Sequence, residues 1–352
     1  MGELRLMKGN EALGEAAIRA GLQGYFGYPI TPQSEVMEYL AQQEPHHNYV
    51  FLQAESEVAA VNMMYGAGGA GARILTTTSS PGFSLMQEGI SYIACAEIPC
   101  LFCNVVRGGP GLGTIQPSQS DYFQSTKGGG HGDYHTIVLT PNSVQEMVDF
   151  VYLGFELADK YRIPVTILSD GAIGQMMEKV ELPDPIEYKP DKPWATTGKT
   201  KDRERNILTS LYIQSEDMEK KNQKLQKKYE KIKQNEVRFD EYKTEDAEII
   251  IVSFGLTSRV TRKSVDIGRA QGMKIGLFRP QTVWPFPYEK LNDYADKDRL
   301  KFFISVEMNA GQMVEDVKLA VCGKKPVHFY GRMGGIVPDS YEVIEQIKKI
   351  KE

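Results

Sequence analysis

The chain has few cysteines, no long apolar run and no excess of basic residues, and each shortage excludes a class of protein. Four cysteines among 352 residues are too few for a disulfide framework. No apolar run reaches the roughly 18 residues of a membrane-spanning helix, and the start, MGELRLMKGNEALG, lacks the apolar core of a signal peptide. A formal net charge of −5 disfavours nucleic-acid binding. We therefore expect a soluble, cytoplasmic protein with neither nucleic-acid nor membrane partners.

The first 180 residues alternate short β-rich segments with helical patterns. Strands are predicted at 25–30, 49–54, 72–80, 99–107, 135–140 and 163–170, and helices at 10–23, 33–43, 55–66 and 143–161. In the last helix, Ser143 and Glu146 form a capping-box pair ahead of an apolar stripe. Strands that alternate with helices of this length indicate parallel pairing, so the sequence predicts an α/β fold with a doubly wound parallel sheet.

The rest of the chain divides into a linker with a charged insert and a second α/β unit. Four prolines within 181–200 predict an extended linker. Residues 201–243 are highly charged, with Leu211, Met218, Leu225 and Ile232 seven apart, which predicts a long amphipathic helix or a helical hairpin. Its lysine-rich stretch is either a solvated face or a docking site for a partner subunit. A second α/β unit follows, with strands at 248–256, 274–280, 301–308 and 326–331. The predicted units are therefore 1–180, 181–244 and 245–352.

Candidate site residues are those that follow each strand, because ligands of open parallel sheets bind beyond the carboxyl ends of the strands. The turn Tyr28-Pro29-Ile30-Thr31-Pro32 follows the first strand. Thr31 there is either a plain helix N-cap, with Pro32 at the first helical position, or a hydroxyl in an anion site.

Two acidic residues, Glu55 and Glu57, follow the second strand at a helix start near Ser56. They either complement the helix dipole or, for Glu57, provide a buried carboxylate for proton chemistry. Arg107 closes the fourth strand ahead of a glycine-rich loop, and its guanidinium suits a bound carboxylate, a bound phosphate or a structural salt bridge.

Two loops give weaker signals. The turn that contains Ser79, Ser80 and Gly82 could cradle an anion, but Ser-Pro-Gly is also ordinary turn chemistry. In KGGGHGDYH, residues 127–135, two histidines are candidate ligand contacts, and with only five histidines in the chain we expect no metal site.

Two patterns imitate cofactor sites. Cys95, Cys100 and Cys103 have the spacing of a plant-type ferredoxin cluster, but the second and third lie in an apolar strand, so we interpret them as buried thiols. Residues 169–171, Ser-Asp-Gly, resemble the start of a diphosphate–magnesium motif, but the asparagine that completes this motif is absent downstream. We therefore do not interpret it as a complete metal–diphosphate site.

Several stretches together resemble the α subunit of 2-oxoacid:ferredoxin oxidoreductases. They are GYPITPQSEV, QAESEVAAVNMMYGA, TTSSPGFSLMQEGISY, VRGGPGLGT and GGGHGDYHTIVLTPNSVQE, then SFGLTSRV, LFRPQTVWPFP and SVEMNAGQMVEDV. The resemblance runs nearly end to end and is greatest to members that act on the branched-chain acid 2-oxoisovalerate (3-methyl-2-oxobutanoate). It implies a thiamine-diphosphate-binding-fold pyrimidine domain and a transketolase C-terminal-like domain.

The resemblance also implies roles for five residues. Glu57 matches the catalytic glutamate that hydrogen-bonds the aminopyrimidine ring of thiamine diphosphate, and Tyr28 and Pro29 belong to the same coenzyme site. Thr31 and Arg107 match the two groups that meet the substrate carboxylate. This pair would orient the 2-oxoacid while carbon dioxide leaves.

The resemblance implies partners as well. A β subunit with a diphosphate-binding domain would share the thiamine diphosphate, and γ and ferredoxin-like δ subunits would complete the assembly, with Mg²⁺ and [4Fe–4S] clusters in the partner subunits. The implied reaction is oxidative decarboxylation of a 2-oxoacid with CoA to acyl-CoA and carbon dioxide, with reduction of ferredoxin, and the chain would be inactive alone. The alternatives are 2-oxoglutarate or pyruvate as substrate, or a non-catalytic nucleotide-binding or electron-carrier module.

Overall fold

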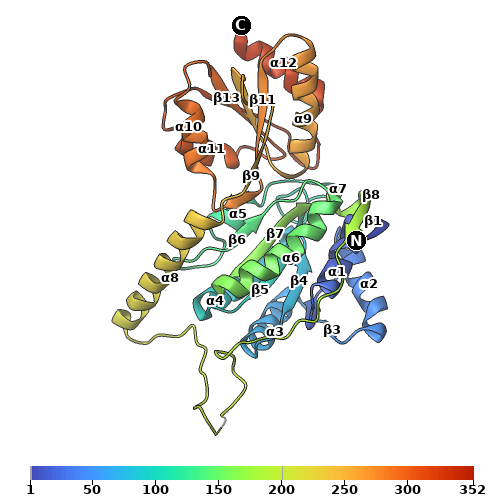
Figure 1. Ribbon diagram of the computed structural model, residues 1–352, viewed down its shortest axis with the longest axis vertical. Helices are drawn as coiled ribbons and strands as arrows, with labels where there is room; N and C mark the ends of the chain where they lie inside the picture. The colour runs from blue at the N-terminus through green and yellow to red at the C-terminus, as the bar shows by residue number, and fades with distance from the viewer. Residues whose placement is uncertain (1, 200) are drawn as a thin grey trace.

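The computed structural model describes residues 2–199 and 201–352, which form two α/β units joined end to end (Figure 1). The first sheet contains β2 (Gly24–Gly27), β3 (Val50–Gln53), β4 (Ile74–Thr78), β5 (Cys100–Val106), β6 (Ile137–Leu139), β7 (Pro164–Asp170) and β12 (Thr282–Trp284). Its order is β12-β6-β7-β5-β4-β2-β3, and its neighbouring strands are parallel except for β12 against β6. The six predicted strands of this region are confirmed with slightly different bounds: β2 begins one residue earlier than predicted, and all six are shorter overall.

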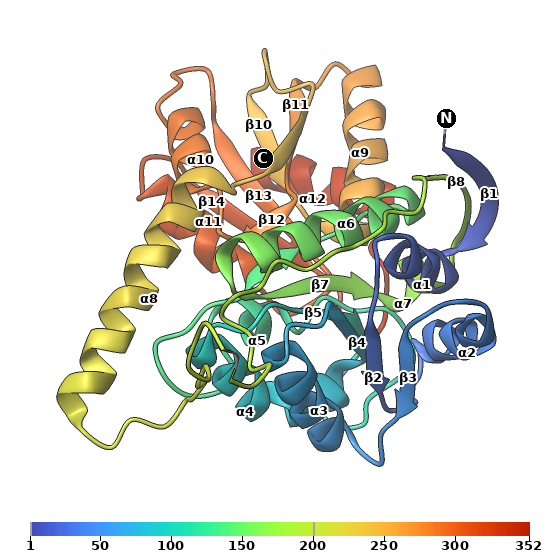
Figure 2. The same ribbon diagram turned by 60° about the horizontal axis from the view of Figure 1, so that its bottom comes forward.

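Helices cover both faces of this sheet, as a doubly wound fold requires. The helices are α1 (Gly9–Arg19), α2 (Ser34–Gln43), the short 3-10 helix η1 (Glu44–His46), α3 (Glu57–Gly69), α4 (Ser80–Ala96), α5 (Tyr122–Thr126), α6 (Val144–Tyr161) and α7 (Gly171–Gln175). Figure 2 shows α1 and α6 on one side of β5 and β7, with α3 and α4 on the other. Strands β4, β5 and β7 are buried throughout, because helices exclude water from both of their faces.

The second sheet has the order β14-β13-β10-β11-β9. Its strands are β9 (Phe239–Tyr242), β10 (Ile249–Val252), β11 (Ile275–Pro280), β13 (Phe302–Glu307) and β14 (Val327–Gly331), and its helices are α9 (Gly255–Ala270), α10 (Tyr288–Ala295), α11 (Met313–Val321) and α12 (Ser340–Lys351). Helices α10 and α11 lie on one face, and α9 and α12 lie on the other (Figure 1). The predicted second parallel unit is confirmed, with β9 added antiparallel at its edge.

Two strands cross the predicted unit boundaries. Strand β8 (Met177–Leu182), which pairs antiparallel with β1 (Glu3–Lys8), runs past residue 180, and β12 leaves the C-terminal unit to extend the first sheet. The division at residues 180 and 244 stays a prediction.

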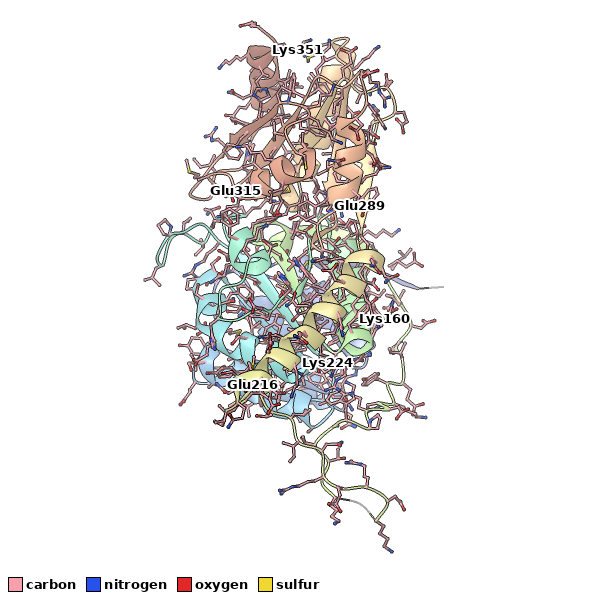
Figure 3. The ribbon with its side chains drawn as sticks, turned by 90° about the vertical axis from the view of Figure 1, so that its left-hand side faces the viewer. Lys160, Glu216, Lys224, Glu289, Glu315 and Lys351 are labelled. Atoms are coloured by element: carbon pink, nitrogen blue, oxygen red, sulfur yellow. The ribbon has the colours of Figure 1, made fainter. Side chains whose placement is uncertain are left out.

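The charged segment forms one helix, α8 (Ser215–Asn235), so the alternative of a helical hairpin is wrong. Figure 3 shows α8 along one side of the molecule, with Glu216 near its lower end and Lys224 halfway up. Leu225, Tyr229 and Ile232 are its buried seam, as the heptad spacing predicts, whereas Leu211 precedes the helix and is exposed. None of the described helices, α8 included, is both long and apolar enough to cross a membrane.

The lysine-rich face of α8 binds the first unit. Lys221, Lys224 and Lys228 approach the carboxylate of Glu97 to 2.6, 2.7 and 3.2 Å. Burial alone would raise the pKa of Glu97, but the positive charges of Lys228, Lys221 and Lys224 lower it to about 2. Lys221 and Lys228 are therefore largely buried against Glu97 and are not part of a solvated face, whereas Lys224 remains 67% exposed.

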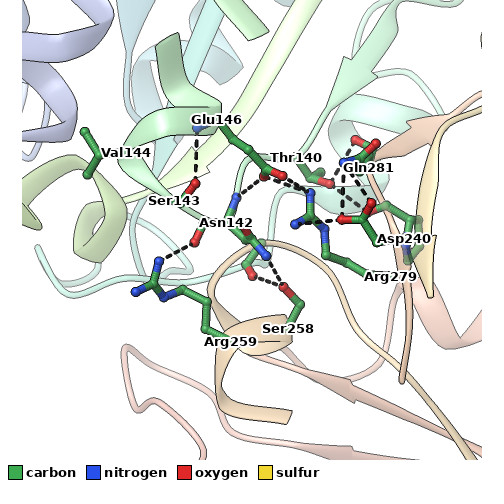
Figure 4. A network of polar contacts seen from close by, with 12 residues as sticks. Thr140, Asn142, Ser143, Val144, Glu146, Asp240, Ser258, Arg259, Arg279 and Gln281 are labelled. Atoms are coloured by element: carbon green, nitrogen blue, oxygen red, sulfur yellow. Dashed lines mark hydrogen bonds and ion pairs between the residues drawn. The ribbon is translucent and has the colours of Figure 1, made fainter. Parts of the chain in front are cut away.

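The two units are joined by polar contacts around the first turn of α6 (Figure 4). Arg279 of β11 donates to both carboxylate oxygens of Glu146, at 2.8 and 2.7 Å, and Asn142 donates to Ser258 at 3.1 Å. Ser143 caps α6 by accepting from the amide of Glu146. Glu146, however, accepts from the amide of Asn142 rather than from Ser143, so only half of the predicted capping box forms.

Candidate functional site

The residues that follow β2, β3, β4 and β5 gather at one edge of the first sheet. This follows from topology, because these four strands are parallel neighbours and their carboxyl ends share that edge. Thr31, Glu57, Ser80 and Arg107 lie there, each just beyond its strand or at the start of the next helix.

Arg107 and Thr31, predicted separately from their strand ends, are in direct contact. The Arg107 guanidinium is buried and donates from Nη1 to the backbone carbonyl of Thr31 at 2.9 Å. Ser80 fixes the backbone of Arg107, accepting from its amide at 3.1 Å and donating to its carbonyl at 3.2 Å. No carboxylate in the described chain pairs with Arg107, so the structural salt bridge among the alternatives is wrong.

Thr31 is not a helix N-cap, which corrects one of the two predicted roles. Helix α2 begins at Ser34, and Gln33 occupies the N-cap position. The fully buried side chain of Gln33 turns back instead, donating to the carbonyl of Tyr28 at 3.2 Å and accepting from Thr77 at 2.5 Å. The turn is thereby held against β4, and the side chains of Thr31, Tyr28 and Pro29 remain exposed.

Glu57 is the first residue of α3, and its side chain is only 5% exposed, whereas Glu55 is exposed. Ser56 caps the helix by accepting from the amide of Ala59 at 3.2 Å. No hydrogen bond or ion pair from the described residues reaches the Glu57 carboxylate. A solvated helix-dipole partner would be exposed, so the low exposure of the residue favours the second alternative, a largely buried carboxylate.

The Glu57 carboxylate fits where it does because Gly82 has no side chain. A Cβ on Gly82 would lie 2.4 Å from Glu57 Oε1 and 2.2 Å from Thr78 Oγ1. Gly82 belongs to the first turn of α4, which begins at Ser80, and Ser80 in turn bonds Arg107. Glu57 and the Thr31–Arg107 pair thus lie around the same helix N-terminus.

A cavity of 420 Å³ opens beside Arg107, between the two units. The first unit contributes Ser80 and Arg107, and the second contributes Met308, Asn309 and Gln312. Arg107 is the only cationic side chain among its lining residues in the part of the chain described. Met308, Asn309 and Gln312 were not predicted as site residues, although they lie within SVEMNAGQMVEDV, one of the stretches that carry the family resemblance.

Residues 127–135 lie outside this cavity and beside α8. They form one wall of an open groove of 1160 Å³, which contains none of Thr31, Glu57 and Arg107. His135 stacks on Trp284 at 4.6 Å and meets Tyr229 edge-on at 5.3 Å, and burial lowers its pKa to about 4. This histidine therefore packs between the first sheet and α8.

The residues of the two patterns that imitate cofactor sites lie within helices and strands or at a helix start. Cys100 and Cys103 are buried within β5, whereas Cys95 lies in α4. Asp170 caps α7 by accepting from the amides of Ala172 and Ile173, and burial raises its pKa to about 6.

Comparisons with known proteins agree with this geometry. Residues 15–243 match the family model of the pyruvate flavodoxin/ferredoxin oxidoreductase thiamine diphosphate-binding domain, and residues 247–343 match that of pyruvate:ferredoxin oxidoreductase core domain II. A ketoisovalerate oxidoreductase subunit VorB from Methanothermobacter marburgensis is 48% identical over 98% of this chain and 97% of its own length. A 2-oxoglutarate synthase subunit KorA from the same organism is 34% identical over all of both chains.

Solved structures give the same result. The 2-oxoglutarate:ferredoxin oxidoreductase from Magnetococcus marinus, with 2-oxoglutarate, coenzyme A and succinyl-CoA bound, superposes with a TM-score of 0.89 at 27% identity. The match covers 100% of this chain and 66% of that longer chain. A split-gene transketolase, with a TM-score of 0.61 at 13% identity over 97% of both chains, shares the fold.

The fold and the first-sheet site define an α/β protein of the thiamine diphosphate-binding type. The chain belongs to the family of thiamine-dependent 2-oxoacid:ferredoxin oxidoreductases, and it is a subunit of an oxidoreductase. The resemblance read from the sequence and the predicted fold class are therefore confirmed.

Proposed function

We propose that this chain is the α subunit of an enzyme that converts 2-oxoisovalerate and CoA to the branched acyl-CoA and carbon dioxide while reducing ferredoxin. The observation that carries the substrate assignment is the single cationic group, Arg107, in the described lining of the cavity. One cation suits a monocarboxylate, whereas 2-oxoglutarate would require a second positive charge for its distal carboxylate. The 48% identity to a ketoisovalerate enzyme subunit, against 34% to a 2-oxoglutarate enzyme subunit, supports the same choice.

The residues around Glu57 fit the aminopyrimidine end of thiamine diphosphate. The hydroxyls of Thr78 and Ser79 are buried and have no partner in the described chain, and the side chain of Glu57, which is 5% exposed, makes no hydrogen bond to a described residue. Unsatisfied buried groups in a folded protein are the expected mark of a ligand that completes their hydrogen bonds. In this proposal Glu57 holds a proton against the coenzyme ring, and Tyr28 and Pro29 border the coenzyme at the neighbouring turn.

Thiamine diphosphate, when bound, supplies the electron sink that lets carbon dioxide leave a 2-oxoacid. The chain's own contribution is to orient the substrate. The guanidinium of Arg107 neutralises the substrate carboxylate, and the exposed hydroxyl of Thr31 donates to it. Arg107 lines the cavity, and its hydrogen bond to the backbone carbonyl of Thr31 at 2.9 Å keeps Thr31 beside it before substrate arrives.

The remaining parts of the enzyme belong to other subunits in this proposal. The diphosphate and Mg²⁺ would be bound by a β subunit, and [4Fe–4S] clusters by a ferredoxin-like δ subunit, with a γ subunit in the same assembly. Exposed apolar side chains border the site and support a partner on this face: Val58 beside Glu57, Leu85 on α4, and Leu112, which is 81% exposed, beyond Arg107.

Co-expression with the neighbouring subunits tests the proposal. The purified complex should reduce ferredoxin or a viologen dye with 2-oxoisovalerate and CoA, with lower kcat/KM for 2-oxoglutarate and pyruvate. The isolated chain should oxidise none of these acids. Turnover by the isolated chain would contradict the shared coenzyme site, and a higher kcat/KM for 2-oxoglutarate would contradict the substrate assignment.

A further inference from the structure

Two consecutive backbone carbonyls in the turn after β2 are each held by a buried side chain. The carbonyl of Thr31 accepts from Arg107 at 2.9 Å, and the carbonyl of Pro32 accepts from Nδ2 of Asn10 at 2.8 Å. Asn10 is fully buried in the first turn of α1, far from β5 in the chain. The turn that carries Thr31 is therefore fixed from two directions.

The orientation of the Asn10 amide follows from its partners. Its Nδ2 also donates to Oε2 of Glu35 at 2.9 Å, and both of its partners are acceptors, so the nitrogen must face them. Burial raises the pKa of Glu35, but hydrogen bonds from Gln175, from the backbone and from Asn10 lower it below its usual value. Glu35 thus remains a charged acceptor at neutral pH, and Gln175 fixes its other oxygen at 2.6 Å.

Close packing keeps Asn10 in place. A Cβ on Gly174 of α7 would lie 2.5 Å from Oδ1 of Asn10, and a Cβ on Gly9 would lie 2.1 Å from the carbonyl of Ile173. Helices α1 and α7 approach so closely at this point that the Asn10 side chain has no room to turn away. Its Oδ1 has no hydrogen-bond partner in the described chain, so both hydrogen bonds of this side chain go to residues of the Thr31 segment.

We propose that Asn10 is a positioning residue for the substrate: by fixing the carbonyl of Pro32, it holds the Thr31 hydroxyl where it receives the substrate carboxylate together with Arg107. The inference rests on the proposed function, because it assigns Thr31 to that carboxylate. No hydrogen bond within the described residues engages the Thr31 hydroxyl, which leaves it available to a ligand. Asn10 acts only through the turn and does not touch the substrate.

A double-mutant cycle in the assembled complex tests this. Asn10→Asp keeps the shape of the side chain but places an oxygen against two acceptors, so KM for the 2-oxoacid should rise about tenfold with little change in kcat. In a Thr31→Val background, the same change should leave KM nearly unaffected, because the hydroxyl that Asn10 positions is already absent. Asn62→Asp, on the exposed face of α3, is the matched control and should leave KM unchanged.

The outcomes separate the positioning role from a general structural one. Equal rises in KM with and without the Thr31 hydroxyl would overturn the inference, as would a fall in kcat alone. If Asn10→Asp does not assemble, Glu35→Gln keeps the shape of the second acceptor of Asn10 but removes its charge, which weakens the hold on Asn10. Its smaller effect on KM should likewise vanish in the Thr31→Val background. The cycle is measured with whichever 2-oxoacid the wild-type complex oxidises, so an error in the substrate assignment appears in the wild type alone.

Discussion

The guanidinium of Arg107 reaches over the end of β4 and donates to the carbonyl of Thr31 at 2.9 Å. This one contact joins the ends of β5 and β2, which are separated in the sheet by β4. The contact holds the backbone of Thr31, whose side chain is exposed, beside a cationic group before any ligand binds. Preorganisation of this kind lowers the entropic cost of orienting a substrate.

Replacing Glu57 by Gln should nearly abolish turnover of the assembled complex. The amide keeps the shape of the buried side chain but cannot exchange a proton with the coenzyme ring, and such a loss costs about 10²–10⁴-fold in rate. Viologen reduction with saturating 2-oxoacid measures the effect. Glu55→Gln is the matched control, because Glu55 is exposed and lies two residues away. Equal rates for the two variants would remove Glu57 from the mechanism.

Arg107→Lys should weaken substrate binding more than it slows the reaction. Lysine retains the charge but loses the planar fork that contacts Thr31 and, in the proposed site, would bind the substrate carboxylate. Hydrogen bonds to charged groups contribute about 1.5–3 kcal/mol, so KM should rise roughly 10- to 100-fold. Steady-state kinetics of the complex give KM, with the exposed Arg299→Lys as control. An unchanged KM would show that the substrate carboxylate binds elsewhere.

Glu97→Gln should release α8 from the first unit. Removing one partner of a buried ion pair leaves uncompensated charge, here on Lys221 and Lys228, at a cost of about 3–5 kcal/mol. Denaturant unfolding should show this loss, and hydrogen exchange should accelerate in α8. Glu230→Gln, which breaks an exposed pair with Lys233, should cost less than about 1 kcal/mol. Similar small losses of stability in both variants would contradict the inference that Glu97 holds α8 against the first unit.

The carboxylate of Glu97 also predicts a pH dependence. Its pKa is about 2 in the folded chain against a reference value of 4.5, so its stabilisation is complete above pH 4.5 and is lost as pH falls toward 2. The free energy of unfolding measured between these pH values should fall more steeply for the wild type than for Glu97→Gln. Parallel curves would show that Glu97 does not supply this dependence.

His135 should make stability fall at mildly acidic pH. Burial, then the charges of Lys233 and Lys127, lower its pKa to about 4 from a reference of 6.5. The unfolded chain therefore binds the proton first, and stability decreases as pH falls from 6.5 to 4. His135→Phe keeps a ring against Trp284. The variant should lose the part of the decrease in the free energy of unfolding that His135 causes between pH 6.5 and pH 4. An identical slope in the variant would assign the effect to another group.

Much of the fold could be predicted because each signal is local. The strand and helix periodicities predicted both α/β units. The buried residues of α8 follow the heptad spacing of Leu225 and Ile232. The start of α2 could not be predicted in this way. Thr31-Pro32 has the residues of a helix start. Gln33, however, accepts a hydrogen bond from Thr77 on β4, a residue distant in the chain, and the helix begins only at Ser34.

The order of strands and helices, the family, and the side chains that follow each strand could all be predicted from the residues alone. The burial of Glu57 but not of Glu55, the contact of Arg107 with Thr31, and the three lysines of α8 around Glu97 became known from the folded chain. Burial and pairing could not be predicted because they depend on groups far apart in the chain. Local patterns specify a residue's secondary structure, whereas its neighbours in space are set by the packing of the whole fold.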